Sequence, residues 1–187
     1  MKYVKGIEAY QDTKASAITL GKFDGLHLGH ELLVSRVEKH QTQDDVVGIV
    51  FAFDMRPMLE KLNRPYQLLL SNEEKAMRLD GRVEYFIDCP FDEHIASMEA
   101  EDFIEKILVG KFHAKYIVVG TDFHFGHGKR GDYRMLQEYS TKYGFQVEVI
   151  EKKCHEGREI SSTYIKELLA EGKRELAHKL LGYEYKK

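Results

Sequence analysis

Two histidines three positions apart, His27 and His30, lie in a glycine-rich stretch, GKFDGLHLGH, at residues 21–30. An imidazole titrates near neutral pH and can donate a hydrogen bond to an oxyanion or a leaving group. If a helix begins near Gly29, its free N–H groups favour an anion, and the two imidazoles can flank one phosphate. The alternative is a strand–helix turn with two incidental histidines. The stretch is not a Walker loop, because Lys22 precedes the turn and no GK[ST] follows.

A second polar segment, ISSTYIK, occupies residues 160–166. Ser161, Ser162 and Thr163 offer hydroxyl and N–H groups at the start of a predicted helix, and Lys166 lies one turn further on. Such a run is often only a helix cap. Because it follows the fifth strand of the same predicted sheet, it is also a candidate partner of the first segment. The two helix starts could then grip a triphosphate from opposite sides.

The third segment, GTDFHFGHGKRGD, covers residues 120–132 and follows the fourth predicted strand. Phe123 and Phe125 could stack on a planar ring or line its pocket, while Asp122 and Arg130 could make polar contacts to it. A mobile surface loop is the alternative. A metal site is a further one, although the spacing of the candidate ligands matches no zinc motif. Those candidate ligands are His124, His127, Cys154 and His155.

Alternating apolar runs and helical patterns predict an α/β fold, a doubly wound parallel sheet of about five strands. In such sheets ligands bind beyond the carboxyl ends of the strands, where the strand order reverses. The predicted strands are 16–20, 46–53, 83–88, 116–119 and 145–150. The predicted helices are 29–39, a capped helix from Ser71 to near Gly81, 99–109, 132–143, and 162–181 with an interruption at Gly172.

The bulk properties indicate one globular domain over residues 1–187. A net charge of -3, from 28 basic and 31 acidic residues, argues against a nucleic-acid partner. The sequence contains no apolar run of roughly 18 residues and no signal-like start, so no membrane partner is expected. Cys89 and Cys154 form no CxxC pair, which favours two free, buried thiols and a reducing, cytoplasmic compartment.

Together the three segments resemble the adenylyltransferase domain of the bacterial FAD synthetase family. GKFDGLHLGH resembles G-x-F-D-G-x-H-x-G-H, a turn that also marks the wider nucleotidyltransferase superfamily. VGTDFHFGHGKRGD resembles V-G-x-D/N-F-x-F-G-x-x-x-x-G-D, and this motif makes the flavin assignment specific. ISSTYIK resembles I-S-S-T-x-I-R. The likeness covers nearly the whole chain and implies a Rossmann-like nucleotidyltransferase fold.

The resemblance implies transfer of AMP from MgATP to the phosphate of FMN, giving FAD and pyrophosphate. His27 and His30 would contact the ATP phosphates, and Lys166 stands where the family usually has arginine. The other expected contacts fall into two groups. Those of ATP are Gly21, Phe23, Asp24, Gly29, Ser161, Ser162 and Thr163, and those of FMN are Pro57, Asp122, Phe123, Phe125 and Arg130. No protein-held metal site is expected, because Mg²⁺ would bridge phosphate oxygens.

Several positions depart from the family pattern. Met55 replaces the first proline of the FDMRP stretch at residues 53–57, and His124 and His127 stand where basic residues are common. Lys166 keeps a charge but lacks the bidentate fork of arginine. Many relatives continue into a riboflavin kinase domain, and the sequence leaves open whether this protein does. Two rival functions also stay open: nucleotidyl transfer to another phosphorylated acceptor, and a catalytically weak flavin- or nucleotide-binding module.

Overall fold

Six parallel strands form the central sheet, in the order β1-β4-β3-β2-β5-β8. The computed structural model describes residues 1–186. The strands are β1 (Lys2–Lys5), β2 (Ser16–Gly21), β3 (Val47–Asp54), β4 (Tyr85–Pro90), β5 (Ala114–Gly120) and β8 (Gln146–Ile150). All five predicted strands are present, and the doubly wound α/β class is confirmed.

The sixth strand, β1, was not predicted. It pairs in parallel with β4 at the edge of the sheet, from Lys2 opposite Tyr85 to Lys5 opposite Asp88. Its sequence, KYVK, has exposed lysines at both ends. A four-residue edge strand buries little apolar surface, so its sequence pattern is weak.

The strand order reverses between β2 and β5. The chain adds β3 and then β4 on one side of β2, and later returns to place β5 on the other side. The carboxyl ends of these two strands are Gly21 and Gly120, where the first and third polar segments begin. These segments therefore lie at the position that doubly wound sheets use for ligands.

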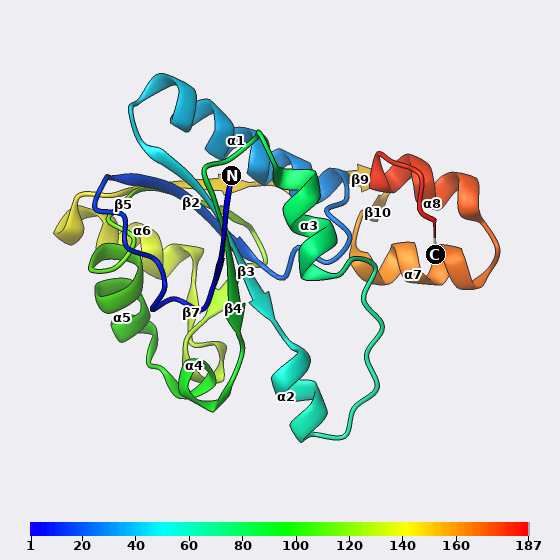
Figure 1. Cartoon of the computed structure of the whole chain (residues 1–187), viewed down its shortest axis with the longest axis horizontal. Helices are drawn as coiled ribbons and strands as arrows, with labels where there is room; N and C mark the ends of the chain where they lie inside the picture. Colours follow the sequence, from blue (N-terminus) through cyan, green and yellow to red (C-terminus); the bar gives the residue numbers. More distant parts are fainter. Residues whose placement is uncertain (187) are drawn as a thin grey trace.

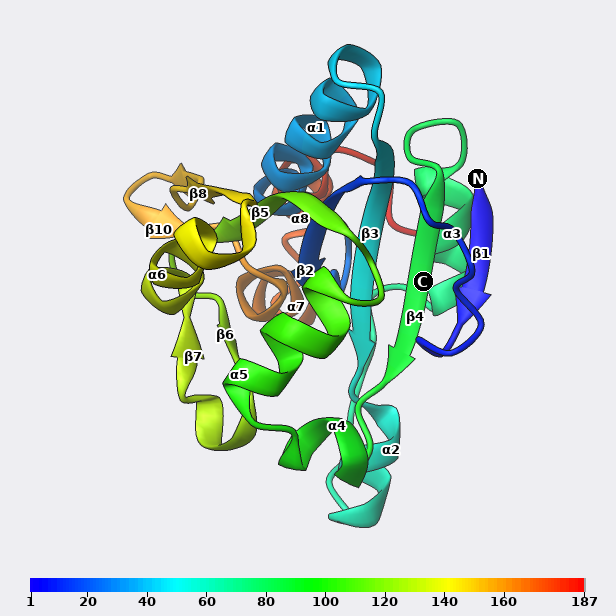
Figure 2. The same ribbon diagram turned by 90° about the vertical axis from the view of Figure 1, so that its left-hand side faces the viewer.

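Helices cover both faces of the sheet (Figures 1 and 2). On one face, α1 (Leu28–Gln43) and α3 (Asn72–Leu79) pack through Val34, Val37 and Leu79. On the other face lie α5 (Ala100–Asp102), the π-helical segment η1 (Phe103–Val109) and α6 (Tyr133–Tyr143). Strands buried on both sides read as nearly continuous apolar runs, which is why β3 was easy to predict.

The predicted helices are largely confirmed. The Ser71 capping box is formed, since the Glu74 N–H donates to Ser71 Oγ at 3.2 Å and the Ser71 N–H donates to Glu74 Oε2 at 2.6 Å. The predicted helix 99–109 is α-helical only at its start. From Phe103 onward its turns are wider, and the Gly110 N–H reaches back five residues to the Glu105 carbonyl.

The C-terminal helices pack as a separate apolar layer at one end of the sheet. They are α7 (Ser162–Ala170) and α8 (Arg174–Leu181), separated at Gly172, which has a φ of +75°. The interruption predicted at this glycine is confirmed. Their core also includes Leu69 and Ile160. Figure 1 shows this pair to one side of the sheet, beyond α3.

Several short elements were not predicted. Two-residue strands carry too little periodicity to be recognised. These elements are α2 (Arg56–Lys61), α4 (Glu93–Ser97), the hairpin of β6 (His124–Phe125) and β7 (Gly131–Asp132) with η2 (His127–Lys129) between its strands, and the hairpin of β9 (Cys154–His155) and β10 (Arg158–Glu159). The last hairpin separates β8 from α7, so the ISSTYIK segment does not directly follow the fifth predicted strand.

One expectation about the cysteines was wrong. Both thiols are free, and Cys89 is buried, but Cys154 is exposed on the β9–β10 hairpin. A two-residue strand at the surface has no second layer to cover it. Among the helices of residues 1–186, none has the length and apolar character that crossing a membrane requires.

Candidate active site

The first turn places two imidazoles side by side. His27 is the N-cap of α1, and its Nδ1 accepts hydrogen bonds from the N–H groups of Gly29 at 3.2 Å and His30 at 3.4 Å. A neutral imidazole that accepts at Nδ1 carries its proton on Nε2, where it can donate to a ligand. The rings of His27 and His30 stack with centroids 3.7 Å apart and an angle of 20°. The helix begins one residue earlier than predicted.

Both imidazoles are neutral at pH 7. Burial lowers the pKa of His27 to about 4, although the Asp24 carboxylate opposes this shift. Burial also holds the pKa of His30 well below its ordinary value, and the neighbouring His27 and Lys75 act in the same direction. These histidines are therefore hydrogen-bond donors rather than cations over the working range of most enzymes.

The backbone before the histidines has an unusual conformation. Phe23 and Leu26 have φ values of +50° and +40°, in the left-handed region, and Gly25 lies at +86°. A Cβ at Gly25 would come within 2.7 Å of Leu69 Cδ1, so only glycine fits. The Phe23 ring is fully buried below the turn, with its centroid 5.1 Å from that of His30. Such strain persists where surrounding packing fixes it, as often occurs at functional sites.

The first and second segments meet at Asp24. Its carboxylate binds Lys166 Nζ at 2.6 Å, and its backbone carbonyl accepts from Ser162 Oγ at 2.7 Å. The other carboxylate oxygen accepts from the Leu69 N–H at 2.8 Å. The two turns predicted to face one another are thus in direct contact.

Not every predicted side chain of the second segment is free for a ligand. Ser161 Oγ accepts from the Tyr164 N–H at 3.2 Å and caps α7, as the alternative interpretation expected. Thr163 is exposed. Tyr183, which sequence reasoning missed, donates its hydroxyl to the Gly25 carbonyl at 2.7 Å. No local pattern around Tyr183 indicates this contact, because its partner lies far away in the sequence.

The third segment forms a short antiparallel hairpin, in which His124 pairs with Asp132 and Phe125 with Gly131. The rings of Phe123 and Phe125 are 9% and 5% exposed and stack on each other at 5.5 Å. Phe125 also packs against Phe103 at 5.6 Å. In this conformation both rings belong to the core, and they do not form an open wall for a planar ligand.

Two charged residues of the hairpin, Asp122 and Arg130, form ion pairs. Asp122 binds Lys152 at 3.0 Å, and Lys152 also binds Glu159 at 2.6 Å on the strand that leads into α7. Arg130 contacts Glu101 and Glu99. Lys152 therefore connects the third segment with the approach to the second.

Pro57 lies apart from this hairpin. It stands in the first turn of α2, at the carboxyl end of β3. A bond of 2.8 Å between Lys61 and Glu93 joins α2 to α4, and the His127 N–H donates to the Met98 carbonyl just after α4. The helix α4 thus lies between Pro57 and the residues expected to share its pocket.

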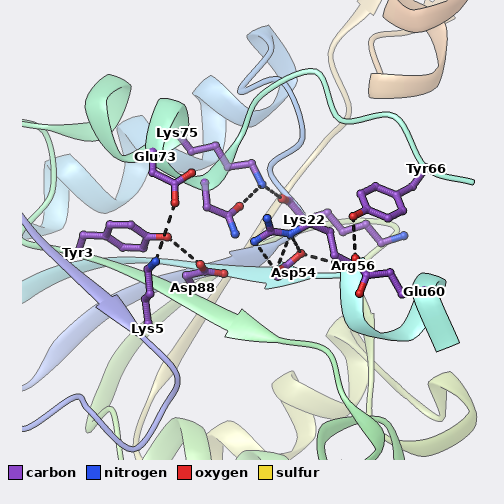
Figure 3. A network of polar contacts seen from close by, with 11 residues as sticks. Tyr3, Lys5, Lys22, Asp54, Arg56, Glu60, Tyr66, Glu73, Lys75 and Asp88 are labelled. Atoms are coloured by element: carbon purple, nitrogen blue, oxygen red, sulfur yellow. Dashed lines mark hydrogen bonds and ion pairs between the residues drawn. The ribbon is translucent and has the colours of Figure 1, made fainter.

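A buried polar cluster near the first turn was not predicted (Figure 3). Asp54 and Asp88 lie on neighbouring strands, at or near their carboxyl ends; Arg56 binds Asp54 at 2.7 Å, and Tyr3 donates to Asp88 at 2.8 Å. Lys75 of α3 is only 2% exposed. The sequence did contain a signal for this cluster, because Asp54 and Asp88 are acidic residues at or near the ends of apolar strands.

Metal-ligand types are not clustered in the described structure. Within residues 1–186, no three His, Cys, Asp or Glu side chains are grouped so that they could hold a metal ion. His124 instead contacts the Asp122 carbonyl through Nδ1 at 2.9 Å.

Lowering the pH is expected to destabilise the fold through His27. The unfolded chain protonates this imidazole near its ordinary pKa of 6.5, whereas the folded chain resists protonation until about 4. The unfolded state thus binds more protons between these values, and about 2 kcal/mol of the free energy of unfolding is lost between pH 7 and pH 5. Urea titrations at both pH values measure the loss. His27→Gln should reduce this pH dependence, and an equal dependence in both proteins would contradict the assignment.

Comparisons with known proteins show the family of this chain. The model of the family described as FAD synthetase matches residues 9–164. A bifunctional riboflavin kinase/FMN adenylyltransferase from Buchnera aphidicola is 33% identical over 186 residues, covering 97% of this chain and 60% of the relative. The protein of the same description from Escherichia coli is 30% identical and matches 99% of this chain and 60% of its own length. The chain thus spans about three fifths of these relatives.

Two solved structures resemble the fold. One, described as a macrolide-efflux protein from Streptococcus pneumoniae, has a TM-score of 0.86 and 26% identity, and the match covers 99% of this chain and 63% of that chain. The other is a pantoate-beta-alanine ligase from Francisella tularensis, with a TM-score of 0.57 and 14% identity over 97% of this chain and 78% of that chain. The second likeness concerns the fold alone. Because the family model matches most of the chain, and because the Buchnera aphidicola relative is 33% identical over 97% of it, the chain belongs to the FAD synthetase family.

Proposed function

We propose that this protein is an FMN adenylyltransferase, which transfers AMP from MgATP to the phosphate of FMN and releases pyrophosphate. Residues 1–187 would form a single domain that carries this activity. The observation that carries the proposal is the junction at Asp24. There the turn with two neutral imidazoles and the start of α7 are held together by Lys166 and Ser162.

The proposed reaction is a direct in-line displacement. An oxygen of the FMN phosphate attacks the α-phosphorus of ATP, a new P–O bond forms, and the bond to the bridging oxygen of the β-phosphate breaks. The nucleophile is ionised at pH 7, so no general base is needed. His27 and His30 donate hydrogen bonds to charge that develops on the α-phosphate, which is the type of stabilisation that preorganised donors provide.

Magnesium would enter with the nucleotide. Both carboxylate oxygens of Asp24 are already engaged, one by Leu69 N–H and the other by Lys166. The two turns therefore offer no free carboxylate to cage a metal ion. A Mg²⁺ ion brought in with ATP would neutralise charge on the leaving pyrophosphate.

The FMN contacts remain predictions for Pro57, Asp122, Phe123, Phe125 and Arg130. In this conformation Asp122 and Arg130 are held only by surface ion pairs, which contribute little to stability. A flavin could replace those partners at low cost. The two phenylalanines would need to move from the core to meet it, or would support the hairpin from below.

Purified protein with ATP, Mg²⁺ and FMN is expected to form FAD and pyrophosphate, detected by chromatography. A parallel reaction with riboflavin in place of FMN tests for kinase activity. Phosphopantetheine, nicotinate mononucleotide and glycerol phosphate test the rival acceptors. Product formed with one of these compounds but not with FMN would show that the acceptor is that compound and not FMN. Tight binding of ATP or FMN without any product would favour the binding-module alternative.

A further inference from the structure

The most unusual side chain outside the proposed contacts is Lys75. It is only 2% exposed, in the first turns of α3, behind the turn that follows β2. Its Nζ donates to the Lys22 carbonyl at 3.3 Å and to Asn72 Oδ1 at 2.9 Å. Figure 3 shows the ammonium directed toward Lys22. Through this bond, α3 is tied to the chain immediately before the histidine turn.

Opposing effects act on the charge of Lys75, and on balance its pKa is lowered. Burial lowers the pKa of the ammonium, and the carboxylates of Asp24, Asp88 and Asp54 oppose that shift. These carboxylates follow or end β2, β4 and β3, so the lysine lies where three strands finish. A buried ammonium is unfavourable unless it is paired. The hydrogen bonds to the Lys22 carbonyl and to Asn72 Oδ1 supply part of that pairing, and the nearby carboxylates supply the rest.

The charge of Lys75 acts on His30. The Nδ1 atom of His30 is buried and has no hydrogen-bond partner within residues 1–186. The groups that face this ring are the stacked imidazole of His27, the Phe23 ring and the positive charge of Lys75. A proton added at Nδ1 would be desolvated and would be repelled by that charge.

We propose that Lys75 is a positioning residue of the adenylyl-transfer site, which anchors the histidine turn through the Lys22 carbonyl and presents a positive charge to His30. The lysine touches neither substrate nor reacting atoms in this role. Its charge adds to the effects of burial and of His27 in keeping His30 neutral. The inference rests on the proposed function for its kinetic consequence, but its effect on His30 can be measured without any reaction.

The decisive comparison is Lys75→Met with Lys75→Arg. Loss of the charge is expected to raise the pKa of His30. It should lower kcat for FAD formation by roughly 10-fold or more, as is typical when an orienting partner is removed. The acidic limb of the kcat–pH profile should move to higher pH, with the KM for ATP changed less. Lys75→Arg should restore both the titration and most of the rate.

The titration is read by NMR from the imidazole signals. The chain has nine histidines, and the signal that disappears in His30→Gln identifies His30. Arg36→Met is the matched control. Arg36 is also a cation in an ion pair, but it lies further along α1 than His30 and binds Glu148 of β8 at 2.7 Å. It should leave the His30 titration and kcat unchanged. A second variant, Asn72→Asp, places a carboxylate beside the ammonium without removing it and should also raise the pKa of His30.

Two outcomes separate the proposals. If the wild-type protein makes no FAD but the His30 titration moves in Lys75→Met, the proposed function fails and the electrostatic role of Lys75 stands. If the wild-type makes FAD, and Lys75→Met melts at a lower temperature with an unchanged titration and an unchanged kcat, Lys75 is only structural and the inference is overturned. If Lys75→Met does not fold, the Asn72→Asp variant decides instead: an unchanged His30 titration in that variant would also overturn the inference.

Discussion

Replacing His30 by alanine is expected to lower the kcat of FAD formation by roughly 10²–10³, the effect of removing one preorganised hydrogen-bond donor. The physical reason is that His30 is neutral and stacked on His27, so its ring is fixed before charge develops on the α-phosphate. ATP affinity should change much less, because the interaction strengthens mainly in the transition state. Steady-state kinetics with varied ATP separate the two effects.

The control for this variant is His94→Ala. His94 is exposed on α4, away from both turns, and its loss should leave kcat within twofold of wild type. Thermal unfolding of both variants checks that the fold is intact. Turnover near the wild-type rate in His30→Ala would remove this residue from the mechanism, and the stacked pair would then be a feature of the helix start alone.

Replacing Asp24 by alanine should lower the free energy of unfolding by about 3 kcal/mol. This substitution removes the carboxylate that binds the Lys166 ammonium and accepts from the Leu69 N–H, and it removes one of the negative charges that act on Lys75. This expected loss is at the low end of the range for breaking a buried ion pair, because 34% of the Lys166 side chain is exposed to solvent. The ion pair between the two turns would be lost, while the bond from Ser162 Oγ to the backbone carbonyl at this position would remain. FAD formation should therefore fall as well.

Urea denaturation measures this loss, with Asp122→Ala as the matched control. Asp122 also pairs with a lysine, at 3.0 Å, but its side chain is 66% exposed. An exposed pair of that kind contributes at most about 1 kcal/mol. A double-mutant cycle of Asp24→Ala with Lys166→Met isolates the pairwise contribution. If Asp24→Ala and Asp122→Ala lower the free energy of unfolding equally, burial of the Asp24 ion pair does not add to stability.

The limits of sequence reasoning are clearest in the sheet. Strands β2, β3, β4, β5 and β8 are apolar enough to be recognised locally, and each was predicted. The edge strand β1 was missed because half of its pattern is solvent-facing lysine. The π-helical turns of η1 were also missed, because the spacing of apolar residues over so short a segment does not distinguish an α-helix from a π-helix.

The site shows the same division between local and long-range information. The three polar segments were recognised from residue types and spacing, and the contact between the first two was expected from the topology of doubly wound sheets. The roles of individual side chains were harder to predict. Phe123 and Phe125 are packed in the core in this conformation, and their contact with a flavin stays a prediction. Lys75 stands in NEEKAMRL, where a lysine normally indicates a solvent-facing helix surface.

By itself, the sequence determined the α/β class, the turn that carries His27 and His30, and the membership of a family, because each depends on residues close together in the chain. Only the tertiary structure decided that Asp24 joins two turns, that Tyr183 reaches Gly25 and that Lys75 is buried behind the histidines. These contacts connect positions far apart in the chain. Packing sets them, and packing depends on the whole set of side chains rather than on any local pattern.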